Sequence, residues 1–198
     1  LNDLKDCGLG SMPGTAAEIL DVEIRNKLTK NKLSSEQWIE IIKTAHSLKI
    51  PTSATIMYGH IDNPEHWAMH LSIIRDIQKE TGGFTELVPL SFVYKDSPLY
   101  LENPKYVRKG PSTDEIKKMH AISRIMLNGW INNIQASWTK LGPEFAQQLL
   151  KIGVNDLGGT LMNESISRSA GSNFGQEITA MEMVKIIRNA DKIPARRS

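Results

Sequence analysis

The stretch TSATIMYGHIDNPEHWAMHLSIIRDIQKETGGFTELVPLSF, residues 52–92, contains the unit from which the rest of the fold is predicted. Residues 52–59 and 84–92 are short and apolar, as strands are. The segment between them has Asn63 and Pro64 at its start and closes on two glycines, as a helix does. A helix between two strands favours parallel pairing with a right-handed crossover. The stretch therefore predicts a β-α-β unit.

The same alternation of helix and strand recurs along the rest of the chain. Further strands are predicted at residues 10–13, 133–137 and 155–160. Further helices are predicted at residues 34–48, 112–129, 143–153 and 179–190, the first of them capped by Ser34 or Ser35. This alternation indicates an α/β fold with a parallel sheet, either a doubly wound sheet or a (β/α) barrel.

The glycines of GLGSMPG, residues 8–14, test the doubly wound alternative. The stretch does not match the dinucleotide fingerprint G-x-G-x-x-G, because its third glycine, Gly14, comes one residue too late. The acidic residue that should end the following strand is also missing. Polar residues instead follow several different strands, which is typical of the active face of a barrel. Since five strands cannot close a barrel of eight, we expect the C-terminal part of a TIM-like (β/α) barrel, with about five parallel strands and outer helices.

Composition and charge exclude several classes of protein. The chain has 24 basic and 22 acidic residues, a net charge of +2, which implies no nucleic-acid partner. The longest apolar runs are too short to cross a bilayer and no signal peptide opens the chain, so no membrane partner is expected. The single cysteine, Cys7, cannot form an internal disulfide or hold a metal cluster alone, which suits a reducing cytoplasm. The opening LNDLKDCG reads as the end of a helix, so we expect a segment to precede it.

The histidines of HIDNPEHWAMH invite a metal-binding interpretation. His66 and His70 stand four residues apart, the spacing by which one helical face grips zinc. Trp67, however, stands where the metalloprotease motif needs a glutamate, so we favour exposed histidines on a helix face. His60 directly follows a strand, where side chains reach bound ligands, and both a functional and a loop-structural interpretation stay open for it.

The stretch NDLGGTLMNESISRSAG, residues 155–171, combines glycines with polar side chains. A phosphate cradle would carry a lysine beside the glycines, and none is there. Small residues let the backbone approach a ligand, and Asn163, Glu164 and Ser165 supply hydrogen-bonding groups, which suits a neutral polyol. The alternative is a glycine-rich turn capped by Ser165 or Ser167.

Six segments together resemble the C-terminal half of subunit 2 of FO synthase, a radical S-adenosylmethionine enzyme of deazaflavin (FO, coenzyme F-420) biosynthesis. They are GLGSMPGTAAEIL, WIEIIKTAH, TIMYGHIDNPEHW, TGGFTELVPLSF, NIQASWTKLG and NDLGGTLMNESISRSAG, and the likeness runs in order from Leu4 to Arg196. The resemblance implies that residues 1–198 are the C-terminal portion of one radical S-adenosylmethionine barrel domain. Its cluster-binding N-terminal half would lie outside this chain.

The resemblance also implies the chemistry. A [4Fe-4S] cluster cleaves S-adenosylmethionine, and the radical produced oxidises L-tyrosine. The Cα–Cβ bond of tyrosine breaks, and the 4-hydroxybenzyl group adds to 5-amino-6-(D-ribitylamino)uracil. The cluster cysteines belong to a C-x-x-x-C-x-x-C loop that Cys7 does not match, so we expect this chain alone to be inactive. The other FO synthase subunit or domain is a further partner. Phe174 stands where we expect the family to have a histidine, which leaves a proton-transfer role at that position in doubt.

Site residues follow from the same resemblance. In PGTAAEILDVEIR, Glu18 and Arg25 come after the first predicted strand, where such barrels place an acid and an arginine for the cofactor's amino or ribose groups and its carboxylate. A helix-end acid and a surface arginine are the alternative. The residues implied for the cofactor are Glu18, Arg25, Tyr58, His60 and Ser91. Those implied for the uracil and its ribityl chain are Gln135, Ser137, Thr160, Asn163 and Glu164. No metal ligand is expected in this chain, and no residue is assigned a catalytic role.

Two other functions stay open. Radical S-adenosylmethionine enzymes that act on futalosine-type compounds of menaquinone synthesis share the PG…AEIL segment, although NDLGGTLMNESISR argues against them. The other is a non-catalytic half barrel that serves as a binding module. Cysteines in an upstream segment would argue against such a binding module.

Overall fold

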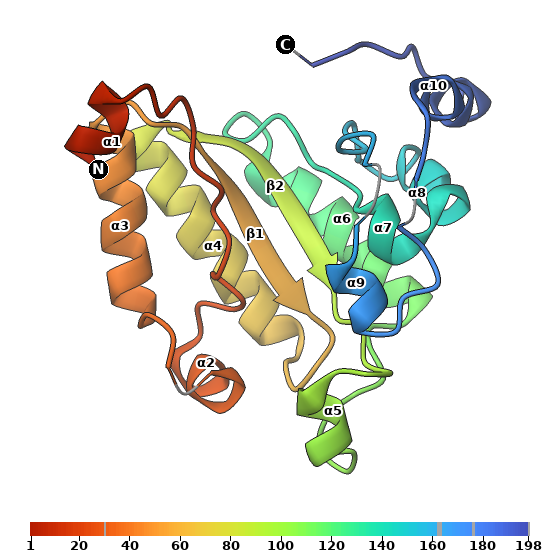
Figure 1. Cartoon of the computed structure of the whole chain (residues 1–198), viewed down its shortest axis with the longest axis horizontal. Coiled ribbons are helices and arrows are strands. Elements are labelled where there is room, and N and C mark those ends of the chain that lie inside the picture. The colour runs from red at the N-terminus through yellow and green to blue at the C-terminus, as the bar shows by residue number, and fades with distance from the viewer. Residues whose placement is uncertain (30, 162–163, 176, 198) are drawn as a thin grey trace.

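The computed structural model describes residues 1–29, 31–161, 164–175 and 177–197 (Figure 1). Its helices and strands, in chain order, are α1 (Asn2–Asp6), α2 (Val22–Leu28), α3 (Ser35–Ser47), β1 (Thr52–Tyr58), α4 (Pro64–Thr81), β2 (Phe84–Ser91), α5 (Pro98–Glu102), α6 (Thr113–Leu127), α7 (Trp138–Leu141), α8 (Pro143–Leu149), α9 (Ile166–Ser169) and α10 (Ala180–Asn189). The helices predicted at 34–48, 112–129, 143–153 and 179–190 are confirmed as α3, α6, α8 and α10. Ser34 caps α3 through a bond from the Gln37 amide.

The strands lie side by side in the order of the sequence. β1 and β2 pair in parallel from Thr52 opposite Phe84 to Tyr58 opposite Ser91. Single parallel bridges extend the pairing on both sides, and they join Met12 to Thr52, Leu87 to Ile134 and Gln135 to Asp156. The fold is therefore mixed α/β with a small parallel sheet, and this order does not reverse as it does in a doubly wound sheet.

The strands predicted at 52–59 and 84–92 are confirmed, but the other three contribute bridges where strands were expected. Side chains take over the backbone groups that a longer ladder would use. Asn155 Oδ1 accepts from the Ile134 amide at 2.9 Å, and Asp156 Oδ1 accepts from the Gly158 amide at 2.6 Å. Local bonds of this kind from Asn and Asp compete with sheet pairing.

The β-α-β unit forms because its helix is bounded by local signals. Asn63 Oδ1 accepts from the amides of Glu65 and His66, and Pro64 occupies the first turn of α4. The helix ends at Gly82, whose φ of 66° is left-handed. α4 and α3 contact β1 and α6 contacts β2, so these three helices cover one face of the sheet (Figure 1).

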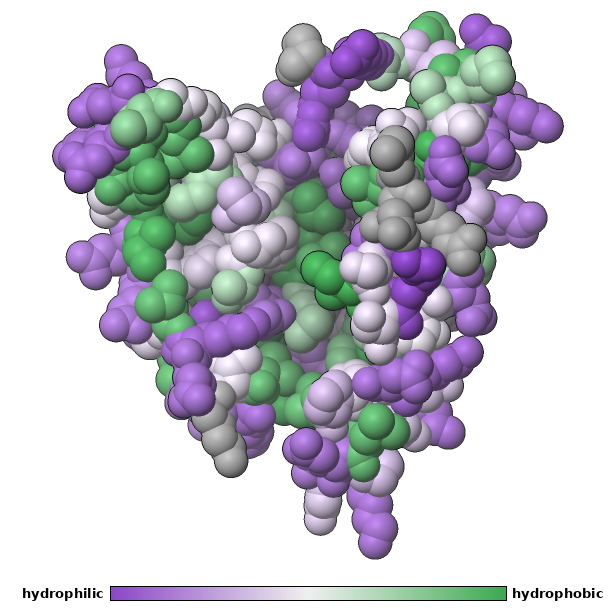
Figure 2. Space-filling view, in the orientation of Figure 1, coloured by the Kyte–Doolittle hydropathy of each residue, from purple (hydrophilic) through white to green (hydrophobic). Residues whose placement is uncertain are grey.

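The opposite face of the sheet is open. Because side chains alternate along a strand, Thr55 and Met57 of β1 and Glu86 of β2 point away from the helices. Figure 2 shows this face hollowed along its centre, with hydrophobic residues at the base of the hollow. We call it the inner face.

The first segment approaches β1 unusually closely. A Cβ at Gly14 would lie 1.7 Å from the carbonyl oxygen of Ser53, and the Gly14 amide donates to Ser53 Oγ at 3.0 Å. Thr55 Oγ1 in turn donates to the Gly14 carbonyl at 2.8 Å. Glycine is required here because another side chain would occupy the space of the neighbouring backbone.

None of the helices in the described ranges combines the length and the hydropathy needed to cross a membrane.

Candidate ligand-binding site at the ends of the strands

A strained turn presents Glu18 beside the end of β1. Ala16 and Glu18 have positive φ values of 61° and 47°, which is uncommon for residues with a Cβ. The Met57 amide of β1 donates to the Glu18 carbonyl at 2.8 Å and fixes the turn against the strand. The Glu18 carboxylate forms an ion pair of 2.5 Å with the exposed Lys32. The turn therefore holds an acid at the edge of the inner face.

Arg25 supports this turn from α2. Its side chain is buried, with 2% of the residue exposed. Nη1 donates to the carbonyl of Ala17 at 2.5 Å, Nη2 to that of Ala16 at 2.9 Å and Nε to that of Leu33 at 2.7 Å. Burial lowers the pKa of the guanidinium, and the nearby charge of Glu18 opposes this. The surface-arginine alternative is wrong, and binding of a cofactor carboxylate by Arg25 stays a prediction.

Lys140 on α7 is linked to Glu164 through Ser167. Its Nζ donates to Ser167 Oγ at 3.1 Å, and the Ser167 amide donates to the Glu164 carboxylate at 3.1 and 3.0 Å. Burial lowers the pKa of the Lys140 ammonium, whereas the charges of Glu164 and Glu18 favour its protonated form. Charges interact this way only when they are close or shielded from water. We call Glu18, Lys140, Glu164 and Ser167 the mouth cluster.

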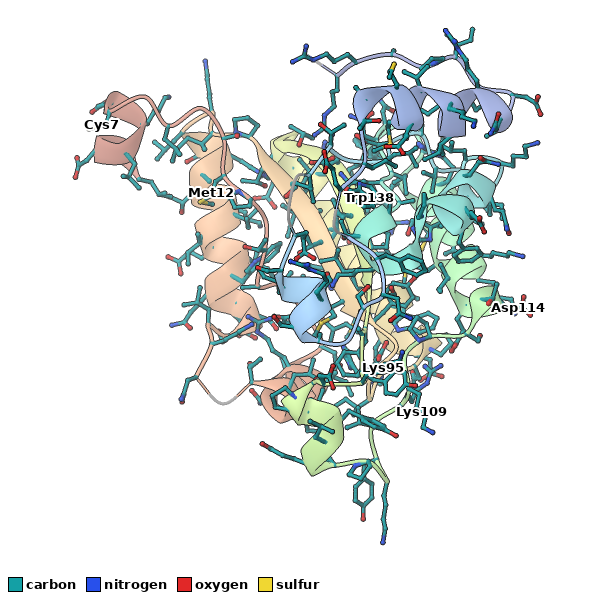
Figure 3. The ribbon with its side chains drawn as sticks, turned by 45° about the vertical axis from the view of Figure 1, so that its right-hand side comes forward. Cys7, Met12, Lys95, Lys109, Asp114 and Trp138 are labelled. Carbon is teal, nitrogen blue, oxygen red and sulfur yellow. The ribbon has the colours of Figure 1, made fainter. Side chains whose placement is uncertain are left out.

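Two anchors hold α7 and the segment after residue 157 together. Trp138 is buried, with 4% exposed, and its Nε1 donates to the Gly159 carbonyl at 3.1 Å (Figure 3). Ser172 Oγ donates to the Thr139 carbonyl at 3.0 Å. Trp138 and Thr139 directly precede Lys140, and their partners Gly159 and Ser172 lie on either side of Glu164 in the sequence, so these bonds hold the two segments together.

A second polar group lies along the inner face itself. Gln135 Nε2 donates to Glu86 Oε2 at 3.2 Å, and the guanidinium of Arg197 bonds to Glu86 and, at 2.7 Å, to Asp156 Oδ2. The hydrogen bond to Glu86 is the main reason why the pKa of Arg197 is raised. Gln135 therefore faces the inner side, but its partner is Glu86 and not Glu164. We call Glu86, Gln135, Asp156 and Arg197 the inner-face cluster.

Sequence reasoning missed Lys140, Glu86, Asp156 and Arg197. Glu86 stands at an inner-facing position of a strand that is otherwise largely apolar, which is a usable signal. Lys140 comes three residues after Ser137, where the fourth predicted strand ends. The sequence has no comparable signal for Arg197, since its tail reaches the sheet only through the tertiary fold.

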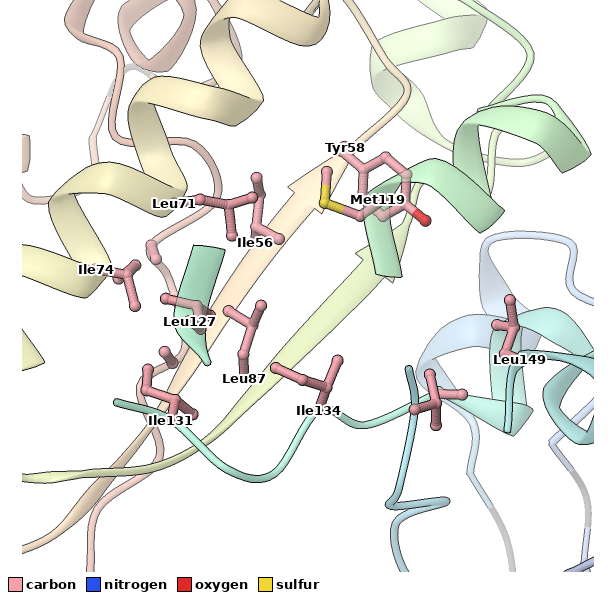
Figure 4. Close-up of a cluster of buried hydrophobic side chains, with 14 of the residues drawn as sticks. Ile56, Tyr58, Leu71, Ile74, Leu87, Met119, Leu127, Ile131, Ile134 and Leu149 are labelled. Atoms are coloured by element: carbon pink, nitrogen blue, oxygen red, sulfur yellow. The ribbon is translucent and has the colours of Figure 1, made fainter. Parts of the chain in front are cut away.

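Tyr58 and Ser91 face the helices. Tyr58 is fully buried among hydrophobic side chains (Figure 4). Its ring meets that of Trp67 edge-on with 5.4 Å between centroids. Its Oη has no hydrogen-bond partner in the described part of the chain, and burial raises the pKa of the phenol. Ser91, its partner in the register, is also buried. The structure does not bring these two residues to the mouth cluster, because strand alternation turns them toward α4 and α6.

His60 and Asp62 organise the loop between β1 and α4. His60 is buried; its Nε2 donates to the Met57 carbonyl at 3.0 Å and its Nδ1 accepts from the Ile61 amide at 2.8 Å. The Asp62 carboxylate accepts from the amides of Gly59 and His60 and from Trp67 Nε1. Burial raises the pKa of Asp62, but the neighbouring His60 side chain, the Gly59 amide and Trp67 Nε1 outweigh that effect, and the pKa is lowered from its usual range. His60 thus has a loop-structural role, and its contact with a cofactor stays a prediction.

His66 and His70 have separate partners. His66 Nδ1 accepts from the Asn63 amide at 3.1 Å as part of the helix cap. His70 is buried, so the exposed position expected for it is wrong. Its Nδ1 accepts from the Leu20 amide and its Nε2 donates to the Thr55 carbonyl, each at 3.1 Å. Burial lowers the pKa of His70 to about 3. In the ranges that the structure describes, no three His, Cys, Asp or Glu side chains gather as a metal site requires.

The remaining predicted substrate residues have separate surroundings. Ser137 Oγ lies 3.1 Å from Thr139 Oγ1, and Thr160 is exposed. Asn163 lies outside the described residues. Glu164, rather than Ser165 or Ser167, supplies the side-chain oxygen at the start of α9, so the cap predicted from the serines is wrong.

Phe174 packs beside this region. Gly142, at the junction of α7 and α8, has a φ of 80°, and a Cβ there would lie 2.8 Å from the Phe174 ring. The next residue, Gly175, accepts through its carbonyl from the Glu164 amide at 3.1 Å. Phe174 thus packs against the α7–α8 junction, and its neighbour in the chain, Gly175, is hydrogen-bonded to Glu164.

The cysteine content tests whether an iron–sulfur cluster fits this chain. A [4Fe-4S] cluster is held by cysteine thiolates, and the chain has only Cys7, an exposed residue that ends α1. The residues present do not fit a cluster. The mouth cluster, with an ammonium and two carboxylates, fits polar organic molecules instead.

Comparison with known proteins identifies similar sequences. Residues 81–198 match the family model described as the CofH/MqnC C-terminal region. The chain is 52% identical over 198 residues to the 5-amino-6-(D-ribitylamino)uracil–L-tyrosine 4-hydroxyphenyl transferase of Methanocaldococcus jannaschii, and it covers 55% of that protein. It is 54% identical over 186 residues to the FO synthase of Mycobacterium leprae, of which it covers 21%. The chain therefore spans about half of the transferase and about a fifth of the FO synthase.

Proposed function

The chain belongs to the family of CofH/MqnC C-terminal regions, and on this basis we propose that it acts as the C-terminal part of a radical S-adenosylmethionine transferase. The complete protein would join the 4-hydroxybenzyl group of L-tyrosine to 5-amino-6-(D-ribitylamino)uracil in FO biosynthesis. The observation that carries this proposal is the identity of 52% over the whole chain to a relative named for that transfer. We further propose that residues 1–198 form one portion of a (β/α) barrel domain.

The arrangement of the strands supports the barrel. Parallel segments in sequence order, with helices on one face and an open inner face, are what a part of a (β/α) barrel presents. In such barrels the ligand lies at the ends of the strands, where the loops carry polar side chains. The mouth cluster occupies that position.

In this proposal the chain binds and orients the reactants. Glu18, held by the turn that Arg25 supports, accepts hydrogen bonds from the amino or ribose groups of S-adenosylmethionine. Ser137, Thr160 and Glu164 lie toward the aminouracil and its ribityl chain, and Gln135 lies deeper on the inner face. Arg25 and His60, which the resemblance also implies for the cofactor, support the turn and the loop at the strand ends. Tyr58 and Ser91, likewise implied, are buried and turned toward the helices, and contact of these four residues with S-adenosylmethionine stays a prediction.

The cofactor supplies the oxidising chemistry. S-adenosylmethionine and a cluster held outside this chain would provide the radical that activates tyrosine. The walls of the inner face exclude water and hold the two substrates in register, which favours coupling between them over loss of the reactive species.

An assay of the complete protein tests the proposal. With reductant, S-adenosylmethionine, L-tyrosine and the aminouracil, we expect formation of the coupled product. A parallel reaction supplies a futalosine-type substrate in place of tyrosine and the aminouracil. Turnover only in the parallel reaction would replace the proposed substrates and keep the fold and cofactor. Cleavage of S-adenosylmethionine in neither reaction would favour a non-catalytic binding module.

A further inference from the structure

We infer that Lys140 and Glu164 bind the charged head of the amino-acid substrate, the ammonium of Lys140 to its carboxylate and the carboxylate of Glu164 to its ammonium. This inference rests on the proposed function. It assigns Lys140 a role in substrate specificity, and it gives Glu164 the amino-acid head as its partner in place of the ribityl chain proposed above.

The geometry of Lys140 suits an anionic partner. A lysine ammonium has three N–H donors, and in the described part of the chain one of them donates to Ser167 Oγ at 3.1 Å. The side chain is half-buried on α7, and the two residues before it are anchored, Trp138 to Gly159 and Thr139 to Ser172. Hydrogen bonds to a partly dehydrated ammonium are stronger than those to an exposed one. Lys140 is therefore placed to hold a carboxylate firmly.

Glu164 suits a cationic partner. The Ser167 amide fixes its carboxylate at 3.1 and 3.0 Å, and its own amide is held by the Gly175 carbonyl at 3.1 Å. A carboxylate has about four lone-pair positions, so it can accept from a ligand while it keeps the Ser167 bond. The Glu18 charge adds to the negative potential around Lys140.

The combination of charges selects the class of ligand. A simple anion at Lys140 would meet the repulsion of Glu164 and Glu18, and a simple cation at Glu164 would meet that of Lys140. A molecule with adjacent carboxylate and ammonium groups satisfies both. Of the two proposed substrates, only L-tyrosine has such a head, because the aminouracil carries neither a carboxylate nor an alkylammonium. S-adenosylmethionine has one too, so the test must separate the two.

Binding of matched analogues to the complete protein provides the test. Tyramine lacks the carboxylate of tyrosine, and 3-(4-hydroxyphenyl)propanoate lacks the ammonium. We expect Lys140→Met to weaken the binding of tyrosine and of the propanoate about 10- to 100-fold, which corresponds to loss of one charged hydrogen bond, and to leave tyramine unaffected. Glu164→Gln should weaken the binding of tyrosine and of tyramine and leave the binding of the propanoate unaffected. Lys140→Arg should restore part of the affinity for tyrosine.

Calorimetry without reductant measures these affinities independently of turnover. Lys151→Met is the matched control, because Lys151 pairs with Asp191 at 2.9 Å on an exposed surface. Its affinities should equal those of the unchanged protein. A thermal melt of each variant checks that the fold is retained.

Several results would overturn the inference. If Lys140→Met lowers the affinity for tyrosine and for tyramine equally, Lys140 has a structural role. If the affinity for S-adenosylmethionine falls by the same factor as that for tyrosine, the site belongs to the cofactor. If the unchanged protein couples tyrosine but Lys140→Met binds all three ligands normally, the inference alone fails. If the unchanged protein does not bind tyrosine, the inference and the proposed function fail together.

Discussion

Arg25 illustrates how a charged residue becomes part of the scaffold. Its fork of donors matches the carbonyls of Ala16, Ala17 and Leu33. Lysine cannot reproduce that fork, so Arg25→Lys would leave buried carbonyls without donors. We expect the free energy of unfolding of the complete protein to fall by about 1–3 kcal/mol in urea titrations. Weaker binding of S-adenosylmethionine with unchanged unfolding would instead return Arg25 to the cofactor site.

His70 makes stability depend on pH. The folded protein keeps its imidazole neutral down to a pKa of about 3, against 6.5 for an ordinary histidine. Below pH 6.5 the imidazole is protonated in the unfolded chain but stays neutral in the folded protein. Protonation therefore favours the unfolded chain, and the free energy of unfolding falls between pH 6.5 and pH 3 by up to about 1.4 kcal/mol per pH unit.

The variant His70→Gln isolates this contribution, because glutamine retains a donor and an acceptor but does not titrate. Unfolding by urea between pH 7 and pH 4 should show a shallower dependence on pH in the variant than in the unchanged protein. Parallel curves for the two proteins would contradict the assignment. The comparison is needed because burial also lowers the pKa of His46 and His120.

At the scale of the elements, the first segment depends on Gly14. The Cβ that Gly14→Ala adds would lie 1.7 Å from the Ser53 carbonyl, so the segment must move away from β1 and lose its bonds to Ser53 and Thr55. We expect a loss of stability of about 2 kcal/mol or more by thermal or urea unfolding. Gly10→Ala is the matched control, because a Cβ there meets no atom within 4 Å. Equal effects of the two substitutions would refute the close approach.

The strands also show what could be predicted from the sequence. β1 and β2 were found because apolar runs and helix caps are local signals. The direction of the Tyr58 side chain was also predictable from alternation, since Tyr58 occupies the same face of β1 as Ile56 and Ala54, which pack in the core. The segments around Ile134 and Asp156 were predicted as strands, but they form single bridges. The sequence carried no sign of this, because side-chain bonds of Asn155 and Asp156 occupy backbone amides there.

At the scale of the whole molecule, the mouth cluster was only partly predictable. Glu18 and Glu164 were expected near a ligand from their segments, but Lys140 joins them only because α7 and α9 meet in space. Convergence of residues this distant in sequence depends on tertiary packing, for which local patterns give no signal.

The 198-residue chain by itself should lack the cofactor chemistry. After anaerobic incubation with iron and sulfide, we expect it to bind no stoichiometric [4Fe-4S] cluster and to release no deoxyadenosine, since Cys7 is its only cysteine. The complete protein, treated identically, should do both. The segment at Met12 forms one edge of the sheet and edges attract further pairing, so we also expect the isolated chain to aggregate more readily. A cluster-bearing, active isolated chain would contradict the proposed division of labour.

The ion pairs of Arg197 also have a mechanical consequence. They fasten the tail beyond α10 to β2 and to Asp156, positions 111 and 41 residues earlier in the chain. A pulling force applied at the tail is therefore borne first by the sheet, and α10 is shielded from it until both pairs give way. In a single-molecule extension experiment, the tail thus acts as a clamp whose rupture precedes the release of the last helix.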